Sequence, residues 1–295
     1  MKLKDIGERQ LTYKITSRFS IPFDDCYFLP VDGEYLLLTT DMVWKKTHFP
    51  KNATPYHIGW YSIAVNVSDI VAKGGEPFAY LVALGLPKEM ESEKLNEILD
   101  GMEDCIKLYG GKVVGGDTKE ADEIMIAITA IGKVKKDEVL PRKGAKAGEA
   151  VFVTGSLGRG GIALLKNDLD KLLLVKPRIK EGRWLAKNRV ATTCMDLSDG
   201  LASSLYQLSK INGVGFRIFA DYLPIDEDAN LELALYYGGD YELLFTAPKE
   251  KKENIEEKIN AKMIGEVIGE RKITLIKDGE EYEIENKGYE HFKST

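Results

Sequence analysis

Cysteine and histidine are scarce in this chain of 295 residues. Its three cysteines, Cys26, Cys105 and Cys194, form no CxxC pair, which excludes zinc-ribbon and thioredoxin-type sites, and their odd number argues against a secreted disulfide framework. The three histidines also stand alone, because none has a partner at a metal-ligand spacing such as HExxH. We therefore expect no thiolate or imidazole metal centre.

Long apolar runs and an excess of positive charge are missing as well. No stretch of about 18 apolar residues could span a membrane, and the first twenty residues hold no apolar core of the signal-peptide type. Lys and Arg number 41 against 47 Asp and Glu, a net charge of −6 without a basic block, which disfavours nucleic-acid binding. The sequence predicts a cytoplasmic protein that binds neither membrane nor nucleic acid.

Three familiar catalytic motifs are absent. There is no GxSxG nucleophile elbow, no Walker GxxxxGK[ST] loop, and no GxGxxG opening a βαβ unit near the N-terminus. The stretch GSLGRGG (155–161) follows a strand-like run and opens a helical pattern, so it could cradle a phosphate. An ordinary strand-to-helix turn explains the same residues, and both interpretations stay open.

What is present is an alternation of short apolar runs with helical patterns. In the first half, a buried strand is expected at 34–41, a helix at 56–73 ended by Gly74-Gly75, and a helix at 95–109 ended by Gly110-Gly111. Strands are expected at 112–118 and 124–128, the latter from alternating isoleucines.

A composition break divides the chain. The segment 133–149 is basic, contains Pro and Gly and has no apolar period, so we expect two domains, 1–140 and 141–295. The second half shows strand patterns at EAVFVTG, VGFRIFA and YELLFT, a helix at about 201–211, and a terminal strand or hairpin at ITLIKDGEEYEIE. The sequence predicts an α/β or α+β fold with mixed sheets and packed helices.

Aspartate recurs just after apolar runs, beside small or polar residues. Taken singly, each aspartate can be a helix cap or a turn residue. Gathered together, such carboxylates would repel one another unless a cation screened them, and oxygen ligands without nearby Cys or His favour Mg²⁺, which usually accompanies phosphates. These positions are Asp24, Asp25, Asp41, Asp69, Asp117, Asp196, Asp199 and Asp240.

Several longer sequence motifs indicate a protein family. LTTDMVWKKTHF (38–49), AVNVSDIVAKGGEP (64–77), VVGGDT (113–118), RKGAKAGEAVFVTGSLG (142–158), DLSDGL (196–201) and GGDYELLFT (238–246) occur in this order. With them the chain resembles the thiamine-monophosphate kinases, of the superfamily of aminoimidazole-ribonucleotide synthase, selenophosphate synthetase and the hydrogenase-maturation dehydratase. The resemblance covers most of the chain and resumes faintly at GYEHF (288–292).

The resemblance implies a two-domain fold that dimerises through its N-terminal domains, with ATP and several Mg²⁺ ions in the cleft between domains. The γ-phosphate would pass directly to thiamine monophosphate, without a general base. Gly116, Asp117, Arg142 and Ser198 would contact ATP, and His48 and Tyr289 the thiamine phosphate. Magnesium would be bound by Asp25, Thr39, Thr40, Asp41, Asp69, Asp117, Asp196 and Asp199.

Two motifs depart from the family pattern. FDDC replaces the usual GDDA, which puts Phe23 where glycine allows a close backbone approach and Cys26 at a small-residue position. Gly239 stands where an acidic substrate contact is usual, and Asp240 is one residue along. The resemblance therefore indicates the ATP-binding residues more firmly than the residues that would bind the acceptor substrate.

Two other functions remain open at this stage. A relative could use ATP to activate a carbonyl substrate and release inorganic phosphate, and a non-catalytic relative could only bind ATP. A non-catalytic protein would be expected to lose some metal aspartates, and none of the eight metal-ligand positions is lost here. Selenophosphate synthesis is disfavoured because the chain has no N-terminal cysteine loop.

Overall fold

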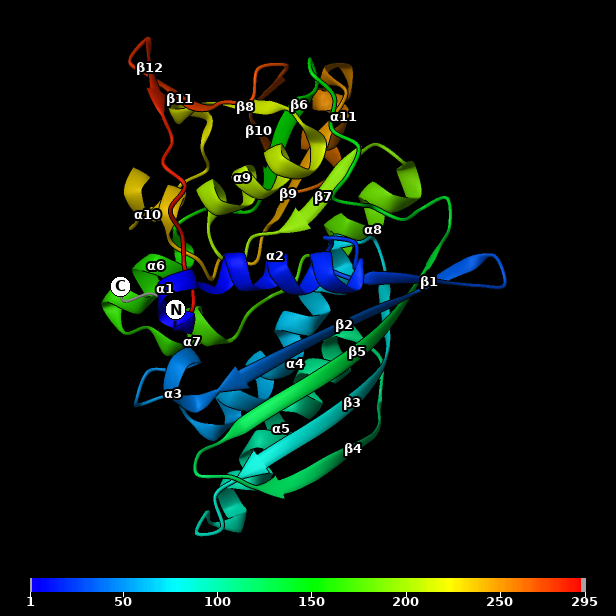
Figure 1. Cartoon of the computed structure of the whole chain (residues 1–295), viewed down its shortest axis with the longest axis vertical. Coiled ribbons are helices and arrows are strands. Elements are labelled where there is room, and N and C mark those ends of the chain that lie inside the picture. The colour runs from blue at the N-terminus through cyan, green and yellow to red at the C-terminus, as the bar shows by residue number, and fades with distance from the viewer. Residues whose placement is uncertain (1, 293–295) are drawn as a thin grey trace.

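The computed structural model describes residues 2–292 and contains two mixed β-sheets, one in each half of the chain, with helices packed against them (Figure 1). The first sheet has five strands in the order β1-β2-β5-β3-β4, and the second has seven in the order β12-β11-β8-β10-β6-β9-β7. The pairs β3–β4 and β8–β11 are parallel and the other pairs antiparallel. The predicted mixed α/β fold is confirmed.

The elements of the first half are α1 (Leu3–Ile6), α2 (Glu8–Phe19), β1 (Tyr27–Val31), β2 (Glu34–Trp44), α3 (Lys45–His48), α4 (Pro55–Ala72), β3 (Glu76–Leu86), α5 (Ser92–Tyr109), β4 (Val113–Glu120) and β5 (Met125–Lys135). Those of the second half are β6 (Ala150–Thr154), α6 (Arg159–Lys166), α7 (Leu169–Leu173), α8 (Ile179–Asn188), β7 (Thr193–Asp196), α9 (Leu201–Asn212), β8 (Gly215–Phe219), α10 (Leu231–Tyr236), β9 (Leu243–Ala247), α11 (Lys252–Lys258), β10 (Ala261–Ile268), β11 (Ile273–Lys277) and β12 (Glu280–Glu283).

Helix α4 is the central element of the molecule. Thr54 caps its start by accepting the His57 backbone N–H, Pro55 occupies the first helical position, and Gly74 with φ of 73° lies just past its end. Most of its side chains are buried on every face, as expected for a helix packed on all sides. It contacts β2, β5 and α5 on one side and α7, α8 and β7 of the second half on the other. The boundary between the halves is therefore built around α4.

Helices α4 and α5 cover one face of the first sheet and leave the other face uncovered (Figure 1). Alternation along β2 puts Leu37 and Val43 against the helices and Met42 on the uncovered face. Met42 is 57% exposed and Leu81 of β3 is 42% exposed. This sheet therefore presents apolar side chains outward.

Helix α2 and the C-terminal segment 286–291 lie close together beside the boundary between the halves (Figure 1). Helix α2, for which the sequence patterns predict no element, runs along this boundary, and Tyr13 stacks under Lys210 of α9 with 3.7 Å between the ammonium and the ring centroid. Among the described residues, no helix is long and apolar enough to cross a membrane.

Candidate active site

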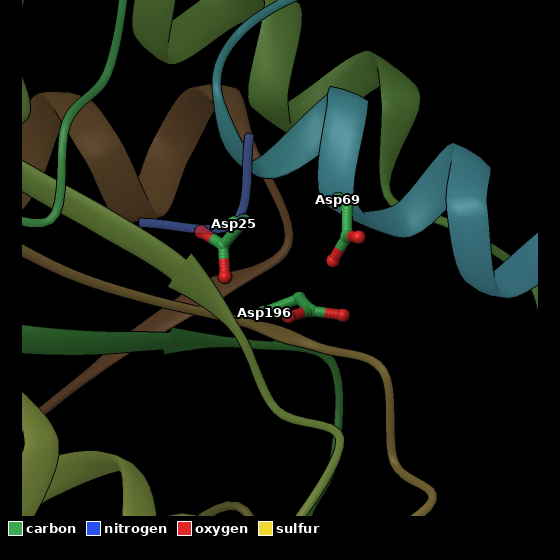
Figure 2. A group of neighbouring side chains, drawn as sticks. All are labelled: Asp25, Asp69 and Asp196. Atoms are coloured by element: carbon green, nitrogen blue, oxygen red, sulfur yellow. The ribbon is translucent and has the colours of Figure 1, made fainter. Parts of the chain in front are cut away.

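Three aspartates from distant parts of the chain meet at the boundary between the two halves. Asp25 precedes β1, Asp69 lies on α4 and Asp196 ends β7, and their carboxylates turn toward one another (Figure 2). One oxygen from each lies within 4.8 Å of the others. The structure thus brings three of the predicted magnesium ligands to one point.

Hydroxyl groups from neighbouring elements orient two of these carboxylates. Thr39 of β2 donates to Asp69 Oδ2 at 2.6 Å, and Ser68 of α4 donates to Asp196 Oδ2 at 2.7 Å. Thr39 lies on the helix-facing side of β2, so its place in the site follows from the pleat. The sequence analysis did not single out Ser68, whose only signal is its position next to Asp69.

Burial and mutual repulsion raise the pKa values of the aspartates in and beside the cluster. Burial, together with Asp41 and Asp196, raises the pKa of Asp69 well above its ordinary value. Burial and Asp25 raise the pKa of Asp196 to about 7 and that of Asp41 to about 6. Burial and the Glu8 carboxylate raise the pKa of Asp199 to about 6. Asp41 and Asp199 therefore belong to the same acidic site.

The pKa of Asp25 is lowered, and not raised, because two cationic side chains contact its carboxylate. Its fully buried carboxylate pairs with Arg142 and with Lys73 Nζ, the latter at 2.6 Å. Burial alone would raise the pKa of Asp25, but Arg142 and Lys73 hold it below its ordinary value. Phe23 packs against Arg142, with 5.5 Å between the guanidinium carbon and the ring centroid, so the unusual Phe23 supports that arginine.

Lys73 is a fully buried cation that joins the two halves. Its ammonium contacts Asp24 at 2.7 Å and donates to the Cys194 carbonyl oxygen of β7 at 2.6 Å. Burial alone would lower the pKa of Lys73, but Asp25 and Asp24 raise it above its ordinary value. No sequence signal identifies this residue, because a lysine at a helix C-terminus is usually exposed.

The donor set suits a hard divalent cation. The atoms that converge at the cluster are carboxylate and hydroxyl oxygens. Burial first, and then neighbouring carboxylates, raise the pKa values of Asp41, Asp69 and Asp196, so a bound cation would favour their charged forms. Asp25, Asp41, Asp69 and Asp196 would hold Mg²⁺, with Thr39 and Asp199 beside them. Such an ion would screen the negative charge of bound phosphates.

Thr40 and Asp117 lie apart from this cluster within one chain. Thr40 points to the uncovered face of the sheet, where it donates to the Ile128 carbonyl oxygen at 3.1 Å. Asp117 is exposed on the edge strand β4 and pairs with Lys119 at 3.0 Å. Three strand spacings separate β4 from β2, roughly 14 Å. Their predicted role as magnesium ligands with the others stays a prediction.

Gly116 and Asp117 border a hollow of about 670 Å³ between β3, β4 and α5. Its walls are mainly apolar and include Leu84, Leu99 and Met102. A Cβ at Gly116 would lie 1.7 Å from the Val82 carbonyl oxygen, so only glycine fits this tight approach to β3. The hollow has the size and apolar lining of a small-ligand site.

The loop after β7 carries Ser198 and packs on the glycine loop before β9. Gly239, with φ of 89°, donates its N–H to the Ser198 carbonyl oxygen at 2.8 Å. The Ser198 side chain is exposed, whereas the Arg142 side chain is directed at Asp25 and at Gln207. Their predicted ATP contacts remain predictions.

The glycine-rich turn 155–161 has its helix-opening N–H groups occupied. Gly158 N and Gly160 N donate to the Asp240 carboxylate at 2.8 and 2.9 Å. Burial raises the pKa of Asp240 to about 7. This aspartate thus caps α6 and takes the place that a bound phosphate would need, which favours the interpretation of 155–161 as a structural turn.

Aromatic rings lie near Asp41 and Asp199. His48 and Tyr289 both lie there, linked through His291, whose ring centroid is 5.0 Å from that of His48 and 4.9 Å from that of Tyr289. Tyr61 of α4 lies deeper, with its hydroxyl 2.5 Å from that of Tyr241. Tyr61 and His291 were not predicted site residues.

We expect Mg²⁺ to stabilise the protein more at about pH 8 than at about pH 5.5. Asp41 and Asp196 have raised pKa values in the folded state, so their contribution to the metal-free protein is greatest below the ordinary value of 3.8 and is lost as the pH rises through about 6 to 7. Bound Mg²⁺ removes that repulsion and competes with protons at low pH. Thermal unfolding with EDTA and with Mg²⁺ at both pH values measures the difference; an equal gain in Tm would contradict it.

Two family models together, and several curated proteins, match this chain over most of its length. A family model described as AIR synthase related protein, N-terminal domain, matches residues 23–134, and the corresponding C-terminal model matches residues 146–278. The thiamine-monophosphate kinase of Methanospirillum hungatei is 39% identical, with 91% of this chain and 92% of the relative covered. That of Aquifex aeolicus is 31% identical, with 99% and 100% covered.

A solved structure described as "AaThiL complexed with AMPPCP and TMP" has the same fold. Its TM-score is 0.89 at 31% identity, and the match covers 99% of both chains. The similarity inferred from the sequence motifs is thereby confirmed.

Proposed function

Since this chain belongs to the thiamine-monophosphate kinase family, within the AIR synthase related proteins, we propose that it transfers the γ-phosphate of ATP to thiamine monophosphate, giving thiamine diphosphate and ADP. The observation that carries this proposal is the buried carboxylate cluster at the boundary between the halves, with aromatic rings near it. The cluster suits metal-bound phosphates, and the rings suit a flat heteroaromatic acceptor.

Transfer would be direct and in line. The transition state spreads negative charge over the γ-phosphoryl oxygens, so catalysis depends on positioning and electrostatic stabilisation and not on a strong base. The acceptor is itself a phosphate, whose oxygen attacks once its charge is screened. Asp25, Asp69 and Asp196 would hold the Mg²⁺ that supplies this screening, and Thr39 and Ser68 would fix two of these carboxylates.

Nucleotide binding would begin in the hollow beside β4. Its apolar wall from Leu99 and Met102 suits an adenine base, and Gly116 and Asp117 at its border would meet the phosphates, as the family motif implies. Asp117 lies on the edge strand β4, three strand spacings or roughly 14 Å from β2, whose Thr39 donates to Asp69. We therefore infer that Asp117 acts in the site of a second subunit.

A homodimer would provide that arrangement. The uncovered face of the first sheet exposes Tyr27, Leu29, Met42 and Leu81, with exposed fractions between 39% and 57%. Burial of such a face against a second copy would remove apolar surface from water at roughly 25 cal/mol per Å². Symmetric association of the same face is the commonest form of dimer.

The other two candidate functions are less well supported. A carbonyl-activating relative would use the same metal aspartates, but the similar kinases cover nearly the whole chain at 31% to 39% identity. A non-catalytic binder would be expected to lose some metal aspartates, and none of the eight predicted positions is lost in this chain.

We expect label from γ-labelled ATP to appear in thiamine diphosphate, one for one with ADP, when the protein is incubated with Mg²⁺ and thiamine monophosphate. Thiamine itself should fail as acceptor, because the attacking oxygen must belong to a phosphate held at the metal cluster. Separation of the products by chromatography measures both outcomes.

The same assay distinguishes the carbonyl-activating alternative. That chemistry would place the label in free phosphate and would need its own carbonyl substrate. Label found only in inorganic phosphate, with thiamine monophosphate unchanged, would disprove the kinase proposal and leave the fold assignment intact.

A further inference from the structure

The two chain ends bind each other beside the acidic cluster. The Glu8 N–H donates to the His291 carbonyl oxygen at 3.3 Å, and the His291 N–H donates to Glu8 Oε2 at 2.8 Å. Two reciprocal bonds of this kind fix both the position and the direction of the C-terminal segment relative to α2.

Arg9, the next residue of α2, extends this junction. Its guanidinium donates to Asn286 Oδ1 at 3.3 Å and to the Tyr289 carbonyl oxygen at 3.2 Å. On the opposite side, the Tyr289 N–H donates to the Asp199 carbonyl oxygen at 3.2 Å. The segment 286–291 is thus held between α2 and the loop that carries the candidate ligand Asp199.

Close packing leaves this segment little freedom. A Cβ at Gly288 would lie 2.5 Å from the Asp199 carbonyl oxygen and 2.9 Å from Arg9 Nη2. Glycine therefore allows the segment to lie directly on the Asp199 loop. Displacement of either chain end would move the rings that follow Gly288.

The junction places His291 between two other rings. Tyr289 meets it edge to face, with an interplanar angle of 86°, and the His48 ring of α3 is tilted against it by 43° at a centroid distance of 5.0 Å. Tyr289 remains 41% exposed, so this ring group is not closed core. The group is assembled from distant parts of the chain, because His48 comes from α3 and the other two rings from the C-terminal segment.

The charges around the rings favour a cation. Glu8 and Asp199 both adjoin the group, because Glu8 accepts the His291 N–H at 2.8 Å and the Tyr289 N–H donates to the Asp199 carbonyl oxygen at 3.2 Å. Burial and His291 lower the pKa of His48, so His48 is neutral near pH 7 and offers a π face without positive charge. Aromatic faces with carboxylates nearby attract a flat, positively charged ring.

We propose that His291 is a specificity-determining residue: held by Glu8 and Arg9, it completes with His48 and Tyr289 an aromatic clamp for the cationic heteroaromatic ring of the acceptor. This inference rests on the proposed function. It adds His291 as a residue that contacts the acceptor, and it assigns the contact of α2 with the C-terminal segment the role of positioning that residue. The clamp binds the ring, while the carboxylate cluster acts on the phosphates.

The test is titration calorimetry of the full chain with thiamine monophosphate and with thiamine, in the presence of Mg²⁺ and a non-hydrolysable ATP analogue. His291→Ala should weaken binding of both ligands about tenfold. His291→Phe, which keeps a π face, should restore affinity to within about twofold of the wild type. KM for ATP and Tm should stay close to wild type, since the ring touches neither the nucleotide hollow nor the core.

Variants of α2 test the junction itself. Glu8→Ala should weaken acceptor binding several-fold, while Glu8→Gln, which keeps an acceptor oxygen for the His291 N–H, should have a smaller effect. Gln10→Ala, at an exposed position of the same helix, is the matched control and should bind like the wild type.

The outcomes separate this inference from the proposed function. Wild-type affinity in His291→Ala, or an equal loss of ATP binding and Tm, would overturn the clamp even if the label reaches thiamine diphosphate. Weakened binding in a protein whose wild type binds thiamine monophosphate without phosphorylating it would support the clamp and refute the kinase. No binding of either acceptor by the wild type would overturn both.

Discussion

Replacement of Asp69 by asparagine is expected to lower kcat at least about a hundredfold without destabilising the metal-free protein. Asp69 lies at the centre of the carboxylate cluster, with one oxygen within 4.8 Å of oxygens of Asp25 and Asp196. Loss of its charge weakens the cation that stabilises the transition state, an effect on the order of 3 kcal/mol. The amide oxygen still accepts the Thr39 hydroxyl, so the local hydrogen bond survives.

Stability should change in the opposite direction from activity. Burial and neighbouring aspartates raise the pKa of Asp69 well above its ordinary value, which means that its charge is unfavourable in the metal-free fold. In EDTA, Asp69→Asn should therefore unfold at the wild-type Tm or above it, whereas added Mg²⁺ should raise its Tm less than that of the wild type.

Steady-state kinetics at saturating Mg²⁺ and thermal unfolding in EDTA measure the two effects. Asp240→Asn is an informative comparison, because Asp240 is also buried but accepts two backbone N–H groups of the turn before α6. An amide NH₂ there would face a donor, so this variant should lose Tm. Near-normal turnover in Asp69→Asn, or a marked loss of its Tm in EDTA, would show that Asp69 is structural.

Apolar periodicity and glycine stop signals correctly predicted several helices and strands. The helix ended by Gly74-Gly75 corresponds to α4, and the alternating isoleucines lie in β5. The basic segment 133–149 begins inside β5, which continues to Lys135, because pairing with β2 extends the strand beyond its apolar alternation. The sequence patterns do not identify β3, where a bulge after Pro77 breaks the alternation.

The sequence predicted the carboxylates of the candidate site but not the residues that tertiary packing brings to them. Aspartates after apolar runs identify carboxylates at strand ends, and Asp25, Asp69 and Asp196 do meet. Which cations neutralise them depends on tertiary packing, so buried Lys73 carried no signal. Sequence distance also hid the meeting of Glu8 with His291, since no local pattern links the two ends of a chain.

Two inactive variants should restore activity when their subunits are mixed. Asp69→Asn removes the cluster centre, and Asp117→Asn removes the carboxylate on the edge strand β4, roughly 14 Å from β2 in the same chain. If Asp117 of one subunit serves the cluster of the other, a mixed dimer has one site with both carboxylates intact and one with neither. Random association at equal amounts makes half of the dimers mixed, so about a quarter of wild-type activity should return.

The control is a mixture of Asp69→Asn with Asp41→Asn. Both residues belong to the cluster of a single chain, as the effect of Asp41 on the pKa of Asp69 indicates, so no combination of these subunits has an intact site and no activity should return. Subunit exchange is verified by capture of an untagged variant through its tagged partner. Exchange without recovery in the Asp69→Asn and Asp117→Asn mixture would mean that each site uses the Asp117 of its own chain, since every site of a mixed dimer would then carry one damaged carboxylate. Wild-type activity of Asp117→Asn by itself would mean that no site uses Asp117.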